Sequence, residues 1–143
     1  MRTSLPLLLL VALPALAEKA NMPPEALART ATHIVTGKVQ AVYTRTAVEG
    51  DWRVTRHVAE VKVAAVGKGE GVAAGDLLYV RYWRRTWNGG GTPPTDTSGH
   101  RGLPEEGETL RIYLARNAYD GFTKDNDDGG FNVIGANGFE RIR

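Results

Sequence analysis

Apolar and polar residues alternate along five separate segments, and this period of two constrains the fold more than any other feature of the chain. The pattern is typical of half-buried β-strands, and only a short run after the N-terminus has helical character. Five short strands with almost no helix indicate an all-β domain. A small five-stranded barrel of the OB (oligonucleotide/oligosaccharide-binding) type fits this count. The segments are 33–44, 57–66, 77–85, 109–115 and 131–142.

The alternation also predicts which side chains point into the core. Gly37 within the first segment predicts a bulge or a sharp bend, and a bulge within 77–85 would exchange the two faces of that segment. Arg111 and Tyr113 are expected to point outward, and we predict a hairpin turn over 46–52 and a tight turn at Asn137-Gly138. The expected inward residues are Val35, Val39, Ala41, Tyr43, Ala59, Val61, Val63, Ala65, Leu78, Val80, Tyr82, Leu110, Ile112 and Leu114.

The N-terminus has the pattern of a secretory signal peptide. Arg2 precedes an apolar run from Leu5 to Leu16, and the run ends in Ala15-Leu16-Ala17. We therefore expect cleavage after residue 17 and a secreted or periplasmic protein with no remaining membrane span. Residues 18–32 are expected to form an N-terminal segment with a short helix near Pro24, which leads into a single domain formed by residues 33–143.

Composition narrows the functional classes. The chain of 143 residues has no cysteine, which excludes disulfides, cysteine zinc sites and a lipid-anchored N-terminus. Its formal net charge of +2 gives no reason to expect nucleic acid as a partner. Thirteen of the 18 basic residues are arginine, which suits recognition of carboxylate, sulfate or phosphate, although a GC-rich genome would give the same bias.

The layout from His33 to Ile142 resembles the secreted OB-fold of netrin-type and tissue metalloproteinase inhibitor domains. The resemblance is carried by "HIVTGKVQAVY", "AEVKVAAVGKGEGVAAGDLLYVRYW", "GETLRIYLA" and the glycine-marked "DGGFNVIGANGF". It implies a small closed barrel outside the cytoplasm. Those inhibitors chelate a protease zinc through an N-terminal cysteine, which this chain lacks, so their activity is not carried over to any residue here.

The stretch "YVRYWRRTWNGGG" is the leading candidate for a binding surface. If Leu78, Val80 and Tyr82 point inward, the opposite face of the strand carries alternating aromatic and arginine side chains. Such a face binds sugars by stacking and anions through guanidinium groups. The alternative is that these side chains stack on one another and are covered by the loop that follows. The predicted ligand-binding residues are Tyr79, Arg81, Trp83, Arg85, Trp87, His100 and Arg101.

The long loop 86–108 supplies the other polar candidates. It carries His100, Arg101 and Ser98, the only serine after the signal segment. A Ser98–His100 nucleophile is an alternative hypothesis, but the two residues are close in sequence and no G-x-S-x-G elbow is present. We therefore expect no enzyme activity and no cofactor.

Metal binding is the last possibility. "DNDDGG" at 125–130 is similar to calcium loops, but its residues do not fit the register of an EF-hand. His33, His57 and His100 do not share a zinc-ligand spacing. We expect no metal site, and the calcium question at Asp125–Asp128 stays open.

The sequence as a whole predicts an exported binding module for a carbohydrate, an anionic polymer or a protein partner. Two alternatives remain. One is a small hydrolase that uses Ser98 and His100, and the other is a purely structural envelope protein.

Overall fold

The computed structural model describes residues 20–94, 98–116 and 130–142, so the predicted signal segment lies outside the described residues. The described part is mostly β-structure with one short helix. Within these ranges, no helix has the length and apolar character needed to cross a bilayer. The elements are α1 (Pro24–Thr30), β1 (His33–Glu49), β2 (Trp52–Lys68), β3 (Leu77–Trp87), β4 (Thr109–Arg116), β5 (Phe131–Val133) and β6 (Phe139–Arg141).

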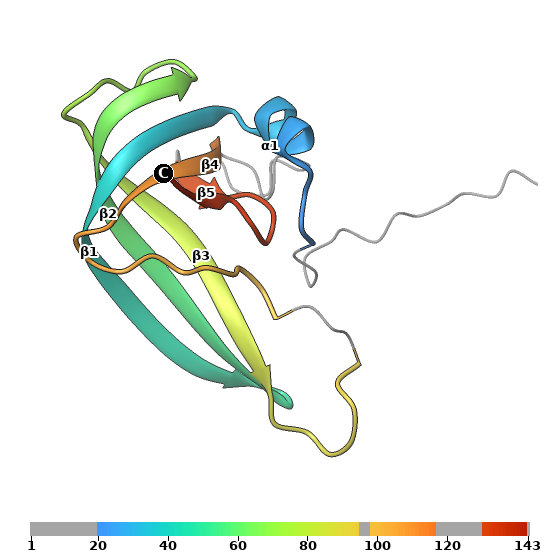
Figure 1. The fold of residues 1–143 in the computed structure, drawn as a ribbon. Coiled ribbons are helices and arrows are strands. Elements are labelled where there is room, and N and C mark those ends of the chain that lie inside the picture. The colour runs from blue at the N-terminus through green and yellow to red at the C-terminus, as the bar shows by residue number, and fades with distance from the viewer. Residues whose placement is uncertain (1–19, 95–97, 117–129, 143) are drawn as a thin grey trace, which may run out of the picture.

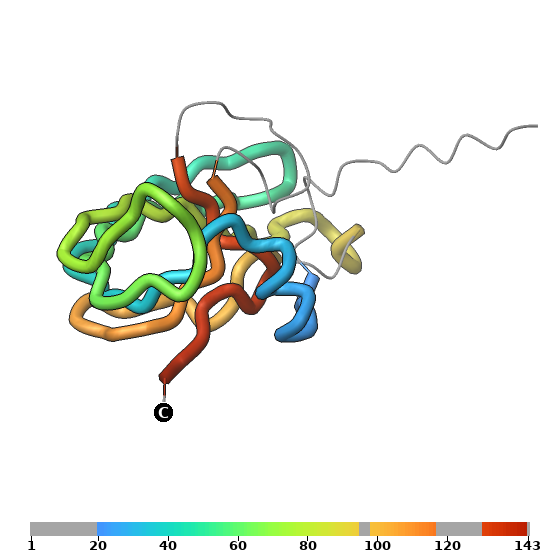
Figure 2. Tube along the Cα trace, turned by 90° about the horizontal axis from the view of Figure 1, so that it is seen from above, coloured from blue at the N-terminus to red at the C-terminus, as the bar shows by residue number. Residues whose placement is uncertain are grey.

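Five of the strands form a ring, in which each strand pairs with two others. β1, β2 and β3 are consecutive antiparallel neighbours, and β5 then joins β3 in parallel and β4 in antiparallel pairing. The ring closes because β4 also pairs with the first residues of β1, from His33 to Lys38. Figure 1 shows the three long strands curving together, and Figure 2 shows the chain winding around a common centre.

The core lies inside this ring and consists of alternate side chains from every strand of it. The predicted inward residues of β3 and β4 are all buried, from Leu78 and Val80 to Leu114. Aliphatic side chains of this size contribute about 1.5–3 kcal/mol each when fully buried. The fully buried side chains include Val35, Val39, Val61, Val80, Leu110, Ile112 and Leu114.

Gly37 lies where β1 has to pair with two strands at once. It is opposite Val63 of β2 and Leu110 of β4, and the β1–β2 register shifts between Thr36 and Gly37. A Cβ at this position would lie 2.5 Å from Val61 Cγ1 and 2.8 Å from the Lys62 carbonyl oxygen. The irregularity predicted at this glycine is therefore present as a register shift, and the close approach of β1 to β2 leaves no room for a side chain here.

The third register shift along β1 corrects part of the predicted core. The β1–β2 register shifts again between Val39 and Ala41, so the faces exchange beyond that point. Val42 packs against the core, whereas Tyr43 is 58% exposed. The prediction that Ala41 and Tyr43 continue the inward face was wrong for this reason.

The same effect occurs near the end of β2. The shift at Gly37 leaves Ala65 exposed and brings Val66 against the core, so the inward assignment of Ala65 was also wrong. The hairpin is tighter than predicted, because β1 runs to Glu49 and β2 starts at Trp52.

The C-terminal segment forms two strands instead of the one predicted. β5 and β6 pair with successive stretches of the same edge of β4, and the Asn137-Gly138 turn lies between them.

Tyr113 points out of the ring as predicted but is buried beneath α1, together with Leu27 and Ile134. It therefore belongs to a second, smaller core and adds nothing to an exposed face.

Candidate functional site

The three long strands project beyond the ring as a twisted sheet, which we call the arm. It comprises residues 43–49 of β1, 52–58 of β2 and 81–87 of β3. The β1–β4 pairing ends at Lys38 and the β3–β5 pairing at Arg81, so the arm extends past both, as Figure 1 shows. The arm carries six arginines, Arg45, Arg53, Arg56, Arg81, Arg84 and Arg85, and with its hairpin turn only two carboxylates, Glu49 and Asp51.

Strand pairing sorts the arm residues onto two faces. Directly opposed residues of antiparallel strands share a face. Arg56 is opposite Trp83, and Arg45 is opposite Arg56, so these three side chains share one face. The predicted stripe on β3 is therefore one edge of a wider surface, which also contains Ala47, Glu49, Val54 and Val58. Its basic and aromatic members are Tyr43, Arg45, Trp52, Arg56, Arg81, Trp83, Arg85 and Trp87.

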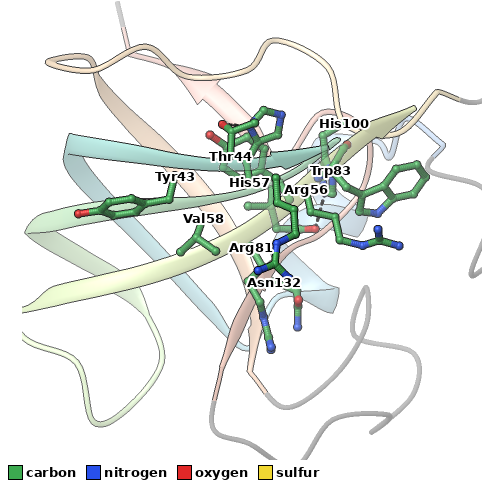
Figure 3. A pocket seen from close by; sticks show the side chains of 12 residues that line it. Tyr43, Thr44, Arg56, His57, Val58, Arg81, Trp83, His100 and Asn132 are labelled. Atoms are coloured by element: carbon green, nitrogen blue, oxygen red, sulfur yellow. Dashed lines mark hydrogen bonds between the residues drawn. The ribbon is translucent and has the colours of Figure 1, made fainter. Parts of the chain in front are cut away.

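A cavity of about 560 Å³ opens where the arm leaves the ring. In Figure 3, Tyr43 and Trp83 lie at opposite ends of the set of lining side chains, with His57 between them. Three of the lining residues are arginines, and none is an aspartate or glutamate. The lining residues are Tyr43, Thr44, Arg45, Arg56, His57, Val58, Arg81, Tyr82, Trp83, His100, Asn132 and Val133.

The outer end of the arm is held by stacking among its own side chains. The Arg85 guanidinium carbon lies 3.9 Å from the ring centre of Trp52 and 5.8 Å from that of Trp83. Trp87 meets Trp52 edge to face at 4.9 Å. Exposed cation–π contacts of this kind contribute about 0.5–1 kcal/mol. Arg85 and Trp87 are thus part of a self-contained stack beside the cavity.

Glycines in the following loop cover two of the indoles. A Cβ at Gly89 would overlap the Trp87 ring, and a Cβ at Gly99 would lie 2.7 Å from Trp83 Cε3. Both indole N–H groups are buried and have no hydrogen-bond partner among the residues that the structure describes. Trp83 lines the cavity, but the loop packs against part of its indole ring.

His100 fastens this loop to the ring of strands. Its residue exposure is 1%, and its backbone N–H donates to the Trp83 carbonyl at 2.9 Å. Its Nε2–H donates to the Val133 carbonyl at 2.8 Å, while Nδ1 accepts from the Trp83 N–H at 3.1 Å. With the proton on Nε2, both ring nitrogens are satisfied by backbone groups. His100 therefore positions Trp83 and the end of β5.

His57 is the histidine of the arm, and it lines the cavity. Its ring stacks on Tyr82 at 4.8 Å between centres, and Nδ1 lies 3.0 Å from the Thr44 hydroxyl. Burial, and then the nearby Arg84 guanidinium, lower the pKa of His57 below its ordinary value of 6.5.

This shift predicts a pH dependence of stability. Because the folded-state pKa is lowered, the unfolded chain takes up a proton first as pH falls below about 6.5. The contribution of His57 to stability is therefore full above that pH and is lost on acidification through the folded-state pKa. We expect denaturant unfolding of the His57→Gln variant to weaken less between neutral and mildly acidic pH than that of the wild type. Equal pH profiles would contradict the prediction.

The remaining predicted residues, Tyr79 and Arg101, do not line the cavity. Tyr79 is 53% exposed on the ring part of β3, and its hydroxyl donates to Glu60 at 3.1 Å. Arg101 is exposed, and its backbone N–H donates to the Ala136 carbonyl. Of the seven predicted residues, the structure brings Arg81, Trp83 and His100 together in the cavity lining, places Arg85 and Trp87 beside it, and separates Tyr79 and Arg101 from it.

The sequence analysis missed most of the β1 and β2 contribution. Tyr43, Arg45, Arg56 and His57 reach the cavity because the hairpin strands extend to Glu49 and Trp52. The signal was present in alternating "YTRT" and "VTRH", but it was assigned partly to a turn.

Within 20–94, 98–116 and 130–142, no group of three or more His, Asp or Glu side chains could hold a metal ion. The calcium question at Asp125–Asp128 lies outside the described residues.

No protein-family model, no curated protein and no solved structure matches the chain.

Proposed function

We propose that the protein is an exported, non-enzymatic binding module in which 33–143 form an OB-type barrel with a ligand site at the arm. The five-stranded ring with long second and third strands supports the OB assignment, since OB-folds bind ligands over the face of those strands. The signal-like segment 1–17 supports a secreted or periplasmic location. On this hypothesis the resemblance to netrin-type and metalloproteinase inhibitor domains extends to fold alone.

The observation that carries this proposal is the cavity itself. It places an exposed aromatic ring, Tyr43, and three arginines around a concavity of small-ligand size. Aromatic and guanidinium groups together suit a carbohydrate, an anionic polymer or a polar segment of a protein partner. Nucleic acid is not proposed, because the chain is close to neutral overall, but the basic arm makes a short single-stranded DNA a necessary control.

A matched pair of tyrosines tests whether the cavity is the binding site. Tyr43 and Tyr79 are similarly exposed, at 58% and 53%, and only Tyr43 lines the cavity. Thermal melts of the mature chain measure whether a candidate ligand stabilises the fold. The candidates are neutral and acidic glycans, nucleotides, single-stranded DNA, calcium and zinc. A ligand at 100 times its Kd stabilises the fold by about 2.7 kcal/mol. We expect Tyr43→Ala to reduce that stabilisation several-fold and Tyr79→Ala to leave it unchanged.

The control and the contradicting outcome follow from the same pair. Both variants should unfold within about 0.5 kcal/mol of the wild type without ligand, since both side chains are at the surface. Equal loss of binding in both variants would favour the predicted β3 stripe over the cavity. Full binding in both would remove Tyr43 from the site.

The hydrolase alternative gains no support from the contacts of His100. Both of its ring nitrogens are engaged by backbone groups, and the Ser98 carbonyl accepts from the Arg85 N–H at 2.9 Å in an extended pairing. A general base has to reach the nucleophile's proton within hydrogen-bond distance. The alternative predicts ester or glycoside hydrolysis that Ser98→Ala abolishes.

One observation favours the structural alternative. From Thr44 to Glu49, β1 pairs only with β2 among the described strands, so its other edge is available to a further strand. An edge of this kind can add a strand from another chain. This candidate predicts concentration-dependent assembly that Thr46→Pro prevents, and assembly of that variant would count against it.

A further inference from the structure

We infer that Arg45 and Arg56 form an oxyanion subsite at the cavity, which binds a sulfate ester, phosphate ester or carboxylate carried by a small sugar ligand. The inference rests on the proposed binding function and names the chemistry that the site takes.

The strand register is the first ground. Arg45 lies directly opposite Arg56 in the β1–β2 pairing, so both side chains project from the same face. Like charges directly opposite one another destabilise an antiparallel pair. A negative group between the two guanidiniums relieves this repulsion and gains charge-assisted hydrogen bonds at the same time.

The local balance of charge is the second ground. Two arginines elsewhere on the described surface are paired with carboxylates, Arg111 with Glu140 at 3.0 Å and Arg141 with Glu108 at 2.9 Å. The lining of the cavity includes Arg45 and Arg56 and contains no aspartate or glutamate. Glu49, which is not among the lining residues, accepts from Arg56 through contacts of 2.9 and 3.2 Å.

Glu49 has two effects in this arrangement. It accepts hydrogen bonds from Arg56 Nη2, and it competes with any incoming anion for the same donors. The side chains of Arg56 and Glu49 are 56% and 52% exposed, so this ion pair is solvated and weak enough to exchange partners. A sulfate or carboxylate can therefore take over one edge of Arg56 while Arg45 binds its other oxygens.

The sugar part of the ligand is argued from the rest of the lining. Tyr43 presents an exposed ring two residues before Arg45, on the same face of β1, and Asn132 adds an amide group to the lining. Aromatic rings with polar groups around them suit a pyranose, which has apolar faces and hydroxyl edges. A cavity of about 560 Å³ has room for one or two such rings.

The test measures binding of glucose 6-sulfate, glucose 6-phosphate, glucuronate, inorganic sulfate, inorganic phosphate and unsubstituted glucose by calorimetry and by backbone amide shifts. We expect the charged sugars to bind, the inorganic ions to bind more weakly and glucose to bind weakest. Arg45→Gln and Arg56→Gln are each expected to weaken binding of the charged sugars by about ten-fold or more. Affinity should also fall with added salt.

Two further variants make the test specific. Glu49→Gln removes the competing carboxylate and should tighten binding several-fold, the opposite sign to the arginine variants. Arg111→Gln removes an exposed arginine outside the cavity, so it should leave the affinity unchanged. All four residues are at the surface, so each variant should fold.

The outcomes separate this inference from the proposed function. If a neutral glycan binds and depends on Tyr43 but not on Arg45 or Arg56, the inference fails and the binding function stands. If Arg111→Gln weakens binding as much as Arg45→Gln, the attraction is non-specific and the inference fails. If none of the charged sugars or ions binds, the subsite is disproved. If single-stranded DNA binds through Arg45 and Arg56 in preference to every sugar, a nucleic acid replaces the proposed ligand.

Discussion

Replacing His100 by alanine is expected to lower the free energy of unfolding by about 3–5 kcal/mol, the largest effect we predict for any polar side chain of the cavity. The imidazole is fully buried and bonds to the Val133 carbonyl and the Trp83 N–H. Alanine leaves a buried acceptor and a buried donor without their partners, each at about 1–3 kcal/mol, and leaves a void as well. Denaturant unfolding followed by tryptophan fluorescence measures this directly.

The control for this prediction is the histidine at the cavity surface. His57→Ala removes a side chain of the same type whose hydrogen bond is to an exposed threonine hydroxyl, so a loss of about 1 kcal/mol or less is expected. His100→Gln, which keeps one donor and one acceptor, should recover part of the stability. A loss below about 1 kcal/mol for His100→Ala would show that the loop is not fastened to the ring of strands through this residue.

The second large effect is expected at Gly37. Gly37→Val should destabilise the fold by about 3 kcal/mol or more, because the added Cβ meets Val61 Cγ1 at 2.5 Å and the Lys62 carbonyl oxygen at 2.8 Å. Val61 is itself fully buried, and the carbonyl belongs to the neighbouring strand, so neither yields easily. Separation of β1 from β2 at this point also disturbs the pairing of β1 with β4.

A second glycine provides the comparison for Gly37. Gly90 has no atom within 4 Å of an added Cβ and no positive φ, so Gly90→Val should change stability by less than about 0.5 kcal/mol. Thermal melts of the two variants, in the same buffer, check the contrast. A Gly37→Val protein as stable as the wild type would mean that the strands separate there without cost.

Alternation predicted the ring part of the fold well, because each strand there has one face in the core. Leu78, Val80 and Tyr82, for example, were placed correctly by period alone. The alternation fails beyond a bulge, since one extra residue exchanges the faces, and this is why Tyr43 was placed inward. No local pattern fixes the position of that extra residue.

The site was predictable only in part, for a different reason. The β3 stripe follows from one strand, and the structure shows its arginines and tryptophans on one face as expected. Arg45 and Arg56 join that face only through the pairing of β1 with β2 and β2 with β3. Partners across a sheet are set by register, which a single sequence does not state.

The stretch "YVRYWRRTWNGGG" combines both interpretations that the sequence offered. Arg81 and Trp83 line the cavity, whereas Arg85 stacks on Trp52 and the glycine loop covers Trp87. The glycines are needed because any side chain at Gly89 would overlap the Trp87 ring. One part of this stretch therefore lines the cavity, and the part that follows packs against other side chains and the loop.

The closure of the ring by β1 and β4 has a consequence for the order of folding. The β1–β2 hairpin joins residues that are close in sequence through a two-residue turn, so it can form within microseconds. Ring closure brings together residues as distant as Thr32 and Leu114, 82 positions apart. Contacts of such long sequence separation form late and slow the overall rate. The arm, and with it the Arg45–Arg56 pair, is therefore expected to be assembled before the ring of strands that supports it is closed.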